Sequence, residues 1–254
     1  MSETTPKLFE YALRLGDDAL VLGHRLSEWI GFAPVLEEEL ALGNIALDNL
    51  DLAQAALTLA AEVEGAGRDA DALAYSRDDT GFRNALLVEQ PNHDFAWTVA
   101  RQALFAAFAL PNYRALAKSA EPRLAAIGAK AARETEYHAR HARSWVLRLG
   151  DGTSESRARM QAAFDELFPY LGELLEVDAV TRELAAAGIA PNPSAFDGEA
   201  HAGIAALLRD ATLVLPASGA FAPRGGRSGR HSEHLSRMLA EMQVVARAHP
   251  GAKW

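Results

Sequence analysis

Two helical stretches carry most of the residues of this chain that could do chemistry. Between residues 122 and 149, side chains spaced by four, four, three and four form one stripe: Lys130, Glu134, His138, His141 and Trp145. Between residues 35 and 63, a second stripe carries Asn44, Asp48 and Asp51. Residues three or four apart lie on one face of a helix. If the two faces meet, carboxylates and imidazoles come together, which is the donor chemistry of a protein metal site.

A pair of metal ions in a four-helix bundle needs more donors than these stripes supply. Such a site takes a carboxylate from each of two helices and a Glu-x-x-His pair from each of the other two. Residues 95–120 form a helical stretch that contains no Asp or Glu. Thr135 stands three residues before His138, where the pair requires a Glu. The spacing therefore argues against a metal centre.

Two other interpretations of the stripes are open. In the first, four residues form a buried and mutually paired polar cluster: Asp48, Lys130, Glu134 and His138. A buried carboxylate requires a cationic or hydrogen-bonding partner, and Lys130 or His138 can supply one. In the second, part of the stripe faces solvent. We favour the buried cluster, as the vestige of a metal site, and expect no catalytic, cofactor-binding or metal-binding residue.

The segment His231-Ser232-Glu233-His234 also has two interpretations. Two imidazoles three residues apart can chelate a metal on one helical face. The same segment matches a helix start, with Ser232 as the capping residue and Glu233 favoured by the helix dipole. No other cluster of His or Cys lies near it in the sequence. We favour the helix start.

Two charged runs carry weaker signals. Glu37-Glu38-Glu39 opens the helical stretch at residues 35–63, where carboxylates favour the free amide groups of a helix N-terminus. The Gly/Arg-rich segment 219–230 contains Arg224, Arg227 and Arg230. These arginines could hold a phosphate or an acidic partner, but most such segments are only connecting loops. The sequence does not assign a role to this segment.

Composition excludes several classes of protein. The chain has 254 residues, a formal net charge of -9 and no Cys. The acidic balance argues against a nucleic-acid partner, and the lack of Cys excludes disulfides and thiolate metal sites. No stretch is long and apolar enough to predict a membrane span or a leader peptide, and no P-loop, dinucleotide-binding glycine pattern or Ser/His/Asp order is present. We therefore expect a cytoplasmic protein that binds neither nucleic acid nor membrane.

Apolar periodicity predicts helices over most of the chain. Four long ones are expected at about residues 8–30, 35–63, 94–118 and 122–149, the second being apolar on most sides and therefore buried. A long crossover at 68–93 carries short helical turns near 71–75 and 82–88. Shorter helices follow near 155–173, 194–209 and 232–249. This order predicts an all-α, ferritin-like four-helix bundle over residues 8–149. Additional C-terminal helices over 153–250 pack outside it, and residues 1–254 form one domain.

Several strings resemble a known family. They are Tyr11-Ala12-Leu13-Arg14-Leu15-Gly16-Asp17-Asp18, Leu86-Leu87-Val88-Glu89-Gln90-Pro91-Asn92, Leu239-Ala240-Glu241-Met242-Gln243, and the shorter matches at Lys130, Tyr137-His138 and His231-x-Glu233-His234-Leu235. These strings resemble the C subunit of the bacterial ring 1,2-phenylacetyl-CoA epoxidase, of the ferritin-like superfamily. The resemblance covers residues 8–254.

The resemblance implies a division of labour within a multicomponent enzyme of aerobic phenylacetate breakdown. In that enzyme a related A subunit holds the di-iron centre and oxidises the ring of phenylacetyl-CoA. A reductase with flavin and iron-sulfur groups supplies electrons from NADPH, and a further B subunit is present. The C subunit is a metal-free structural partner of A. An independent ferritin-like di-iron oxidase or metal-storage protein is the alternative.

Overall fold

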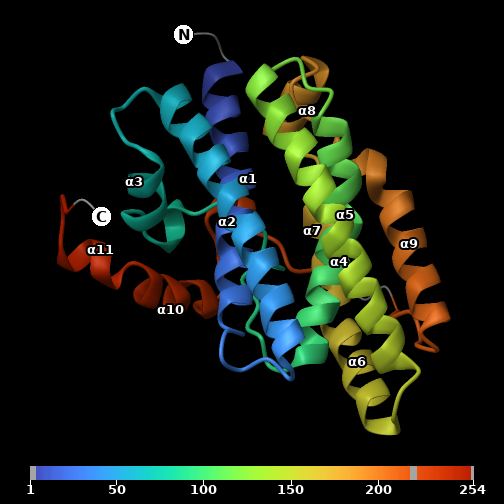
Figure 1. Ribbon diagram of the computed structural model, residues 1–254. Coiled ribbons are helices and arrows are strands. Elements are labelled where there is room, and N and C mark those ends of the chain that lie inside the picture. The colour runs from blue at the N-terminus through green and yellow to red at the C-terminus, as the bar shows by residue number, and fades with distance from the viewer. Residues whose placement is uncertain (1–3, 218–221, 253–254) are drawn as a thin grey trace.

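The computed structural model describes residues 4–217 and 222–252, and these residues form helices, turns and loops with no strand among them. Four long helices make the bundle (Figure 1): α1 (Thr4–Ser27), α2 (Leu36–Glu64), α4 (Phe95–Leu116) and α5 (Pro122–Gly150). The prediction of an all-α bundle is confirmed.

The bundle consists of two antiparallel helix pairs. α1 packs along α2, α4 packs along α5, and α2 contacts α5. The crossover between α2 and α4 is long enough for these two helices to run parallel (Figure 1). Trp29, just after α1, packs edge-to-face on Phe95 at the start of α4, with ring centroids 5.8 Å apart. This contact holds the C-terminal end of α1 beside the N-terminal end of α4.

Shorter helices surround the bundle. They are α3 (Ala70–Tyr75), α6 (Ser154–Leu167), α7 (Leu171–Leu174), α8 (Ala179–Ala186), α9 (Asp197–Asp210), α10 (Glu233–Met242) and α11 (Val244–Ala248). Single 3-10 turns are η1 (Asp79–Gly81), η2 (Phe168–Tyr170), η3 (Pro193–Phe196) and η4 (Gly226–Ser228). α6 and α9 pack on α4 and α5, and α8 packs on α1. The helix predicted at 232–249 is divided into α10 and α11, and the one at 155–173 into α6, η2 and α7.

Two glycines allow the paired helices to approach closely. A Cβ atom at Gly16 of α1 would lie 2.7 Å from Leu57 Cγ of α2, and one at Gly128 of α5 would lie 2.6 Å from the backbone nitrogen of Ala117. Both distances are shorter than packed atoms tolerate. A larger residue at Gly16 would displace the Leu57 side chain, whereas one at Gly128 would meet the backbone at Leu116 and Ala117 and push the helices apart.

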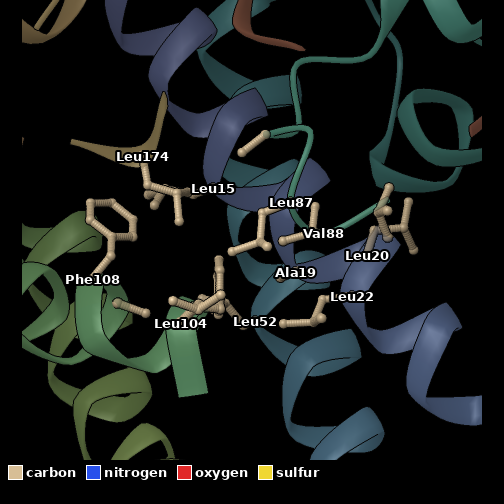
Figure 2. Close-up of a cluster of buried hydrophobic side chains, with 14 of the residues drawn as sticks. Leu15, Ala19, Leu20, Leu22, Leu52, Leu87, Val88, Leu104, Phe108 and Leu174 are labelled. Carbon is tan, nitrogen blue, oxygen red and sulfur yellow. The ribbon is translucent and has the colours of Figure 1, made fainter. Parts of the chain in front are cut away.

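The hydrophobic core includes the crossover as well as the helices. Buried apolar side chains form one cluster that extends from Leu8 to Leu239. Figure 2 shows Leu87 and Val88 of the crossover among side chains of α1, α2 and α4, and both are fully buried. The crossover is therefore part of the packed interior.

The short helical turn predicted at 82–88 is absent. Residues 82–85 are irregular and residues 86–89 form a turn. Backbone N–H groups in this stretch donate to carboxylates of other elements: Arg83 to Asp17, Ala85 to Asp18 and Leu86 to Glu173. Because side chains satisfy these donors, the backbone does not need helical hydrogen bonds.

α2 is less buried than its apolar composition predicts. Leu36, Leu40 and Leu47 are exposed. α1, α3 and α5 are the elements that pack on α2 most closely, and among the described residues they leave one apolar face open. The expectation that α2 is buried on most sides is therefore wrong for this face.

Candidate functional site

The stripes of α2 and α5 meet where the two helices contact each other, and the side chains of His138 and Asp48 are 10% and 36% exposed there. Asp48 is therefore only partly buried, not fully buried as predicted. Asp48 Oδ2 of α2 lies 2.9 Å from His138 Nε2 of α5. One turn further along α5, His141 Nε2 lies 2.7 Å from Glu38 Oε2. The Trp145 side chain packs against the core. His138 and His141 of the α5 stripe therefore lie at the contact between α2 and α5.

Lys130 departs from the predicted buried cluster. Its Nζ pairs with Asp51, and the two side chains are 50% and 57% exposed. The same Nζ lies 3.7 Å from Glu134 Oε1. A long Lys stem at the edge of a helix carries the ammonium into solvent, so Lys130 is a surface residue and not a buried member of the cluster.

Burial is the main cause of the pKa shifts of His138 and Glu134. It lowers the pKa of His138, against the opposing effect of the hydrogen bond to Asp48. Burial and then the Asp48 charge raise the pKa of Glu134, with Lys130 acting in the opposite direction. Burial therefore favours the neutral forms of His138 and Glu134.

A carboxylate-bridged pair of iron ions does not fit these residues. The cavity between Asp48, Glu134 and His138 has a volume of about 10 Å³, roughly the space of one water molecule. α4 lines it with Gln102, Phe105, Ala106 and Tyr113, and contributes no carboxylate. No group of three or more His, Cys, Asp and Glu residues within 4–217 and 222–252 is placed to hold a metal.

A second polar group lies between α1, the crossover and the C-terminal segment, and the spacing of residues in the sequence did not predict it. It contains four buried carboxylate side chains, which we call the carboxylate network: Asp17, Asp18, Glu89 and Glu173. On α1, Asp17 pairs with Arg77 of the crossover. The adjacent Asp18 lies 2.7 Å from Arg227 of the Gly/Arg-rich segment. Each of these two carboxylates thus connects α1 to a segment that is distant in sequence.

The other two carboxylates accept hydrogen bonds from backbone and side-chain amides. Glu173 accepts hydrogen bonds from the N–H groups of Leu86, Gly225 and Gly226, at 2.7, 2.8 and 2.9 Å. Glu89 accepts from Asn84 Nδ2 at 2.9 Å and from the N–H of Ser232 at 2.6 Å. A carboxylate that receives several N–H groups is held in place and satisfies donors that would otherwise be buried without a partner.

The His231–His234 segment begins a helix and is not a metal box. His231 Nδ1 lies 2.7 Å from Glu89 Oε2, and its Nε2 lies 3.1 Å from the carbonyl oxygen of Phe82. Ser232 occupies the residue before α10, but its side chain makes no capping bond, so the expected side-chain cap is absent. Glu89 binds the Ser232 backbone N–H instead.

The geometry of His231 favours the imidazolium ion. Burial is the largest single effect and lowers the pKa of this side chain. The hydrogen bond to Glu89, the charge of Glu89 and the Phe82 carbonyl together outweigh it, so the pKa is raised. Both ring nitrogens face oxygen acceptors, and only the doubly protonated ring donates from both. His231 therefore serves as the cationic partner of Glu89.

The open surface of α2 forms an apolar face. We call it the outer face and define it by Ile30, Phe32, Val35, Leu36, Leu40 and Leu47, which are 50% to 80% exposed. Leu36, Leu40 and Leu47 are spaced by four and seven, so they fall on one side of the helix. Exposed contiguous apolar patches on soluble domains mark sites of association.

The fold and the bundle centre define a class: an all-α bundle protein in which a possible metal site is closed and poor in donors. The chain belongs to the family described as phenylacetic acid catabolic protein, because the family model matches residues 1–254. It is 46% identical over 248 residues to the C subunit of 1,2-phenylacetyl-CoA epoxidase from Escherichia coli (strain K12), and the match covers 98% of this chain and 99% of that relative. No helix within the described residues is long and apolar enough to cross a membrane.

Proposed function

We propose that this chain is a non-catalytic structural subunit of a 1,2-phenylacetyl-CoA epoxidase that acts in aerobic phenylacetate breakdown. It binds and stabilises a homologous A subunit, which holds the di-iron centre, while the enzyme is completed by an NADPH-dependent reductase and a B subunit. The similarity to the C subunit of the Escherichia coli epoxidase, which extends over nearly the whole chain, supports this proposal.

The observation that carries the non-catalytic part is the closed bundle centre. Its cavity of about 10 Å³ leaves no room for a substrate, and Gln102 of α4 lines it in place of an acid. The Asp48–His138 contact of 2.9 Å occupies donors that a metal would otherwise need. These features favour a supporting role over an oxidase or a metal store.

The outer face supports the binding role. Its apolar side chains lie on the first half of α2 and just before it, and the exposed Glu37 lies beside them. A helix of the A subunit, apolar on one side and basic at its edge, would complement this surface. An obligate contact of this kind buries about 2,000 Å² or more in total.

Co-purification tests the proposal. The chain, expressed with the A subunit from the same organism, is expected to elute with it as one complex. The double variant Leu40→Glu/Leu47→Glu is expected to lose the partner while keeping its own helical spectrum. Val214→Glu is the matched control, since Val214 is 71% exposed and lies outside the outer face. Separate elution of the unmodified proteins would contradict the assembly role.

A further inference from the structure

A second exposed surface lies on α5, the helix beside the outer face. We call it the arginine edge and define it by Arg133, Tyr137 and Arg140, all of which are exposed. These residues are spaced by four and three, so they lie on one side of α5. Because α2 and α5 contact each other and lie side by side (Figure 1), the arginine edge and the outer face belong to neighbouring helices.

Tyr137 connects the arginine edge to α2. Its ring centroid lies 6.2 Å from that of His141, and His141 Nε2 lies 2.7 Å from Glu38 Oε2 of α2. The same ring lies 6.3 Å from the ring of His138, which contacts Asp48 of α2. Tyr137 therefore lies over the contact between the two helices, and the outer face continues through it onto α5.

Exposed aromatic side chains are confined to this side of the molecule. Among the described residues, only Phe32 of the outer face and Tyr137 of the arginine edge are aromatic and exposed, at 80% and 42%. Aromatic residues and Arg are enriched in protein–protein interfaces, and Tyr and Arg are frequent among the residues that dominate binding. The composition of the two surfaces is therefore that of an interface.

The two arginines of the edge carry charges that no carboxylate neutralises. On the same helix, Arg123 pairs with a carboxylate of α2 and Arg143 with one of α9. The ion pairs within residues 4–217 and 222–252 include neither Arg133 nor Arg140. The chain has a net charge of -9, so these cations reverse its overall sign locally. By charge complementarity they fit acidic side chains of a partner.

We infer that the partner-binding surface extends from the outer face onto the arginine edge, where a helix of the partner presents acidic residues to Arg133 and Arg140. This inference rests on the proposed function, because the A subunit is the partner in both. The apolar side of that helix covers Tyr137 and the outer face. A basic residue near Glu37, in the first turn of α2, and acidic residues near the two arginines give the helix one direction and one register.

Dissociation of the purified complex with the A subunit from the same organism, measured by sedimentation at several salt concentrations, tests the inference. Between about 0.05 M and about 0.5 M NaCl, the Kd is expected to rise several-fold, because salt screens charges at the edge of an interface. Arg133→Gln/Arg140→Gln should raise the Kd about tenfold at low salt and make it less dependent on salt. Arg133→Glu/Arg140→Glu should raise it further, because like charges then face each other.

Two more variants separate the contacts. Tyr137→Ala should raise the Kd about tenfold and leave its dependence on salt unchanged, since no charge is removed. Arg182→Glu/Arg237→Glu is the matched control, because it makes the same change in net charge at exposed positions of α8 and α10. It should leave the Kd unaltered. All the substituted side chains are exposed, so each variant should keep its helical spectrum.

The outcomes distinguish this inference from the proposed function. A complex that forms with the unmodified chain, and is equally tight with both variants of Arg133 and Arg140, would overturn the inference and leave the assembly role standing. Equal weakening by the control variant would do the same, because net charge and not the arginine edge would then be responsible. If the unmodified proteins form no complex, both are overturned.

Discussion

His231 and Glu89 are 142 positions apart in the chain, yet His231 Nδ1 lies 2.7 Å from Glu89 Oε2. Both side chains are almost completely enclosed, at 2% and 0% exposure. This pair fastens the start of α10 to the crossover. The family strings that contain Glu89 and His231 therefore encode a structural contact.

The His231–Glu89 pair should make stability depend on pH. His231→Gln is expected to lower the free energy of unfolding by about 3–5 kcal/mol at pH 6, because it leaves a buried carboxylate without its cation. The folded-state pKa of His231 is raised above 6.5, so its contribution is complete below about pH 6.5 and is lost as the pH rises through the folded value. Urea denaturation at pH 6 and pH 8.5 measures this difference.

The control for His231 is His201 of α9, whose side chain is 44% exposed, and His201→Gln should change little at either pH. An equal effect of His231→Gln at both pH values would show that the imidazolium form is not what stabilises the fold.

Arg227 should be essential to the carboxylate network. Arg227→Met leaves Asp18 buried and unpaired, so a loss of about 3–5 kcal/mol is expected in urea denaturation. In the same segment, Arg224 and Glu176 are 51% and 45% exposed. Arg224→Met should therefore cost under about 1 kcal/mol. Adding Asp18→Asn to Arg227→Met should recover part of the loss; full additivity would contradict the pairing.

Lys130 and His138 should differ in their effects on stability. Lys130→Met is expected to change the free energy of unfolding by under about 0.5 kcal/mol, as a surface change does. His138→Ala should cost about 1–3 kcal/mol, because it removes a buried side chain and its bond to Asp48. A similar loss for both variants would show that Lys130 is buried after all.

His138 should also contribute to acid unfolding. Its folded-state pKa is lowered below 6.5, so the unfolded chain takes up the proton first as the pH falls. Stability should therefore decrease with acidification from about pH 6.5 down to the folded pKa, and this decrease should be smaller in His138→Ala. Thermal unfolding between pH 5 and pH 7 provides the measurement.

The sequence predicts the helices because apolar periodicity is a local property. It predicts the contact of α2 with α5 because residue spacing places polar side chains on one face of each helix. The exposure of Lys130 does not follow from the same spacing. The helical period places Lys130 on the stripe, but the length of its side chain lets the charged end reach solvent.

The carboxylate network could not be found from spacing. Asp17 and Asp18 bind Arg77 and Arg227, and these pairs depend on how distant segments fold back onto α1. The signal that was present is the Asp17-Asp18 dipeptide among the apolar residues Leu15, Ala19 and Leu20, since buried charges require partners. For the same reason, the sequence predicts a helical turn in the crossover that is absent.

The closed bundle centre leads to a prediction about metals. Protein expressed with excess iron, manganese or zinc and then dialysed should contain well under one equivalent of any of them by elemental analysis. The reason is the lack of a carboxylate from α4 and the cavity of about 10 Å³. One or two equivalents that disappear in Asp48→Ala would revive the metal-storage alternative.

NADPH-dependent oxidation of phenylacetyl-CoA by the A subunit with the B and reductase subunits, measured with and without this chain, tests the central claim most directly. We predict that turnover requires this chain, that Leu40→Glu/Leu47→Glu fails to restore it, and that this chain with reductase alone is inactive. Full activity without this chain, or turnover by this chain in the absence of the A subunit, would contradict the proposed role.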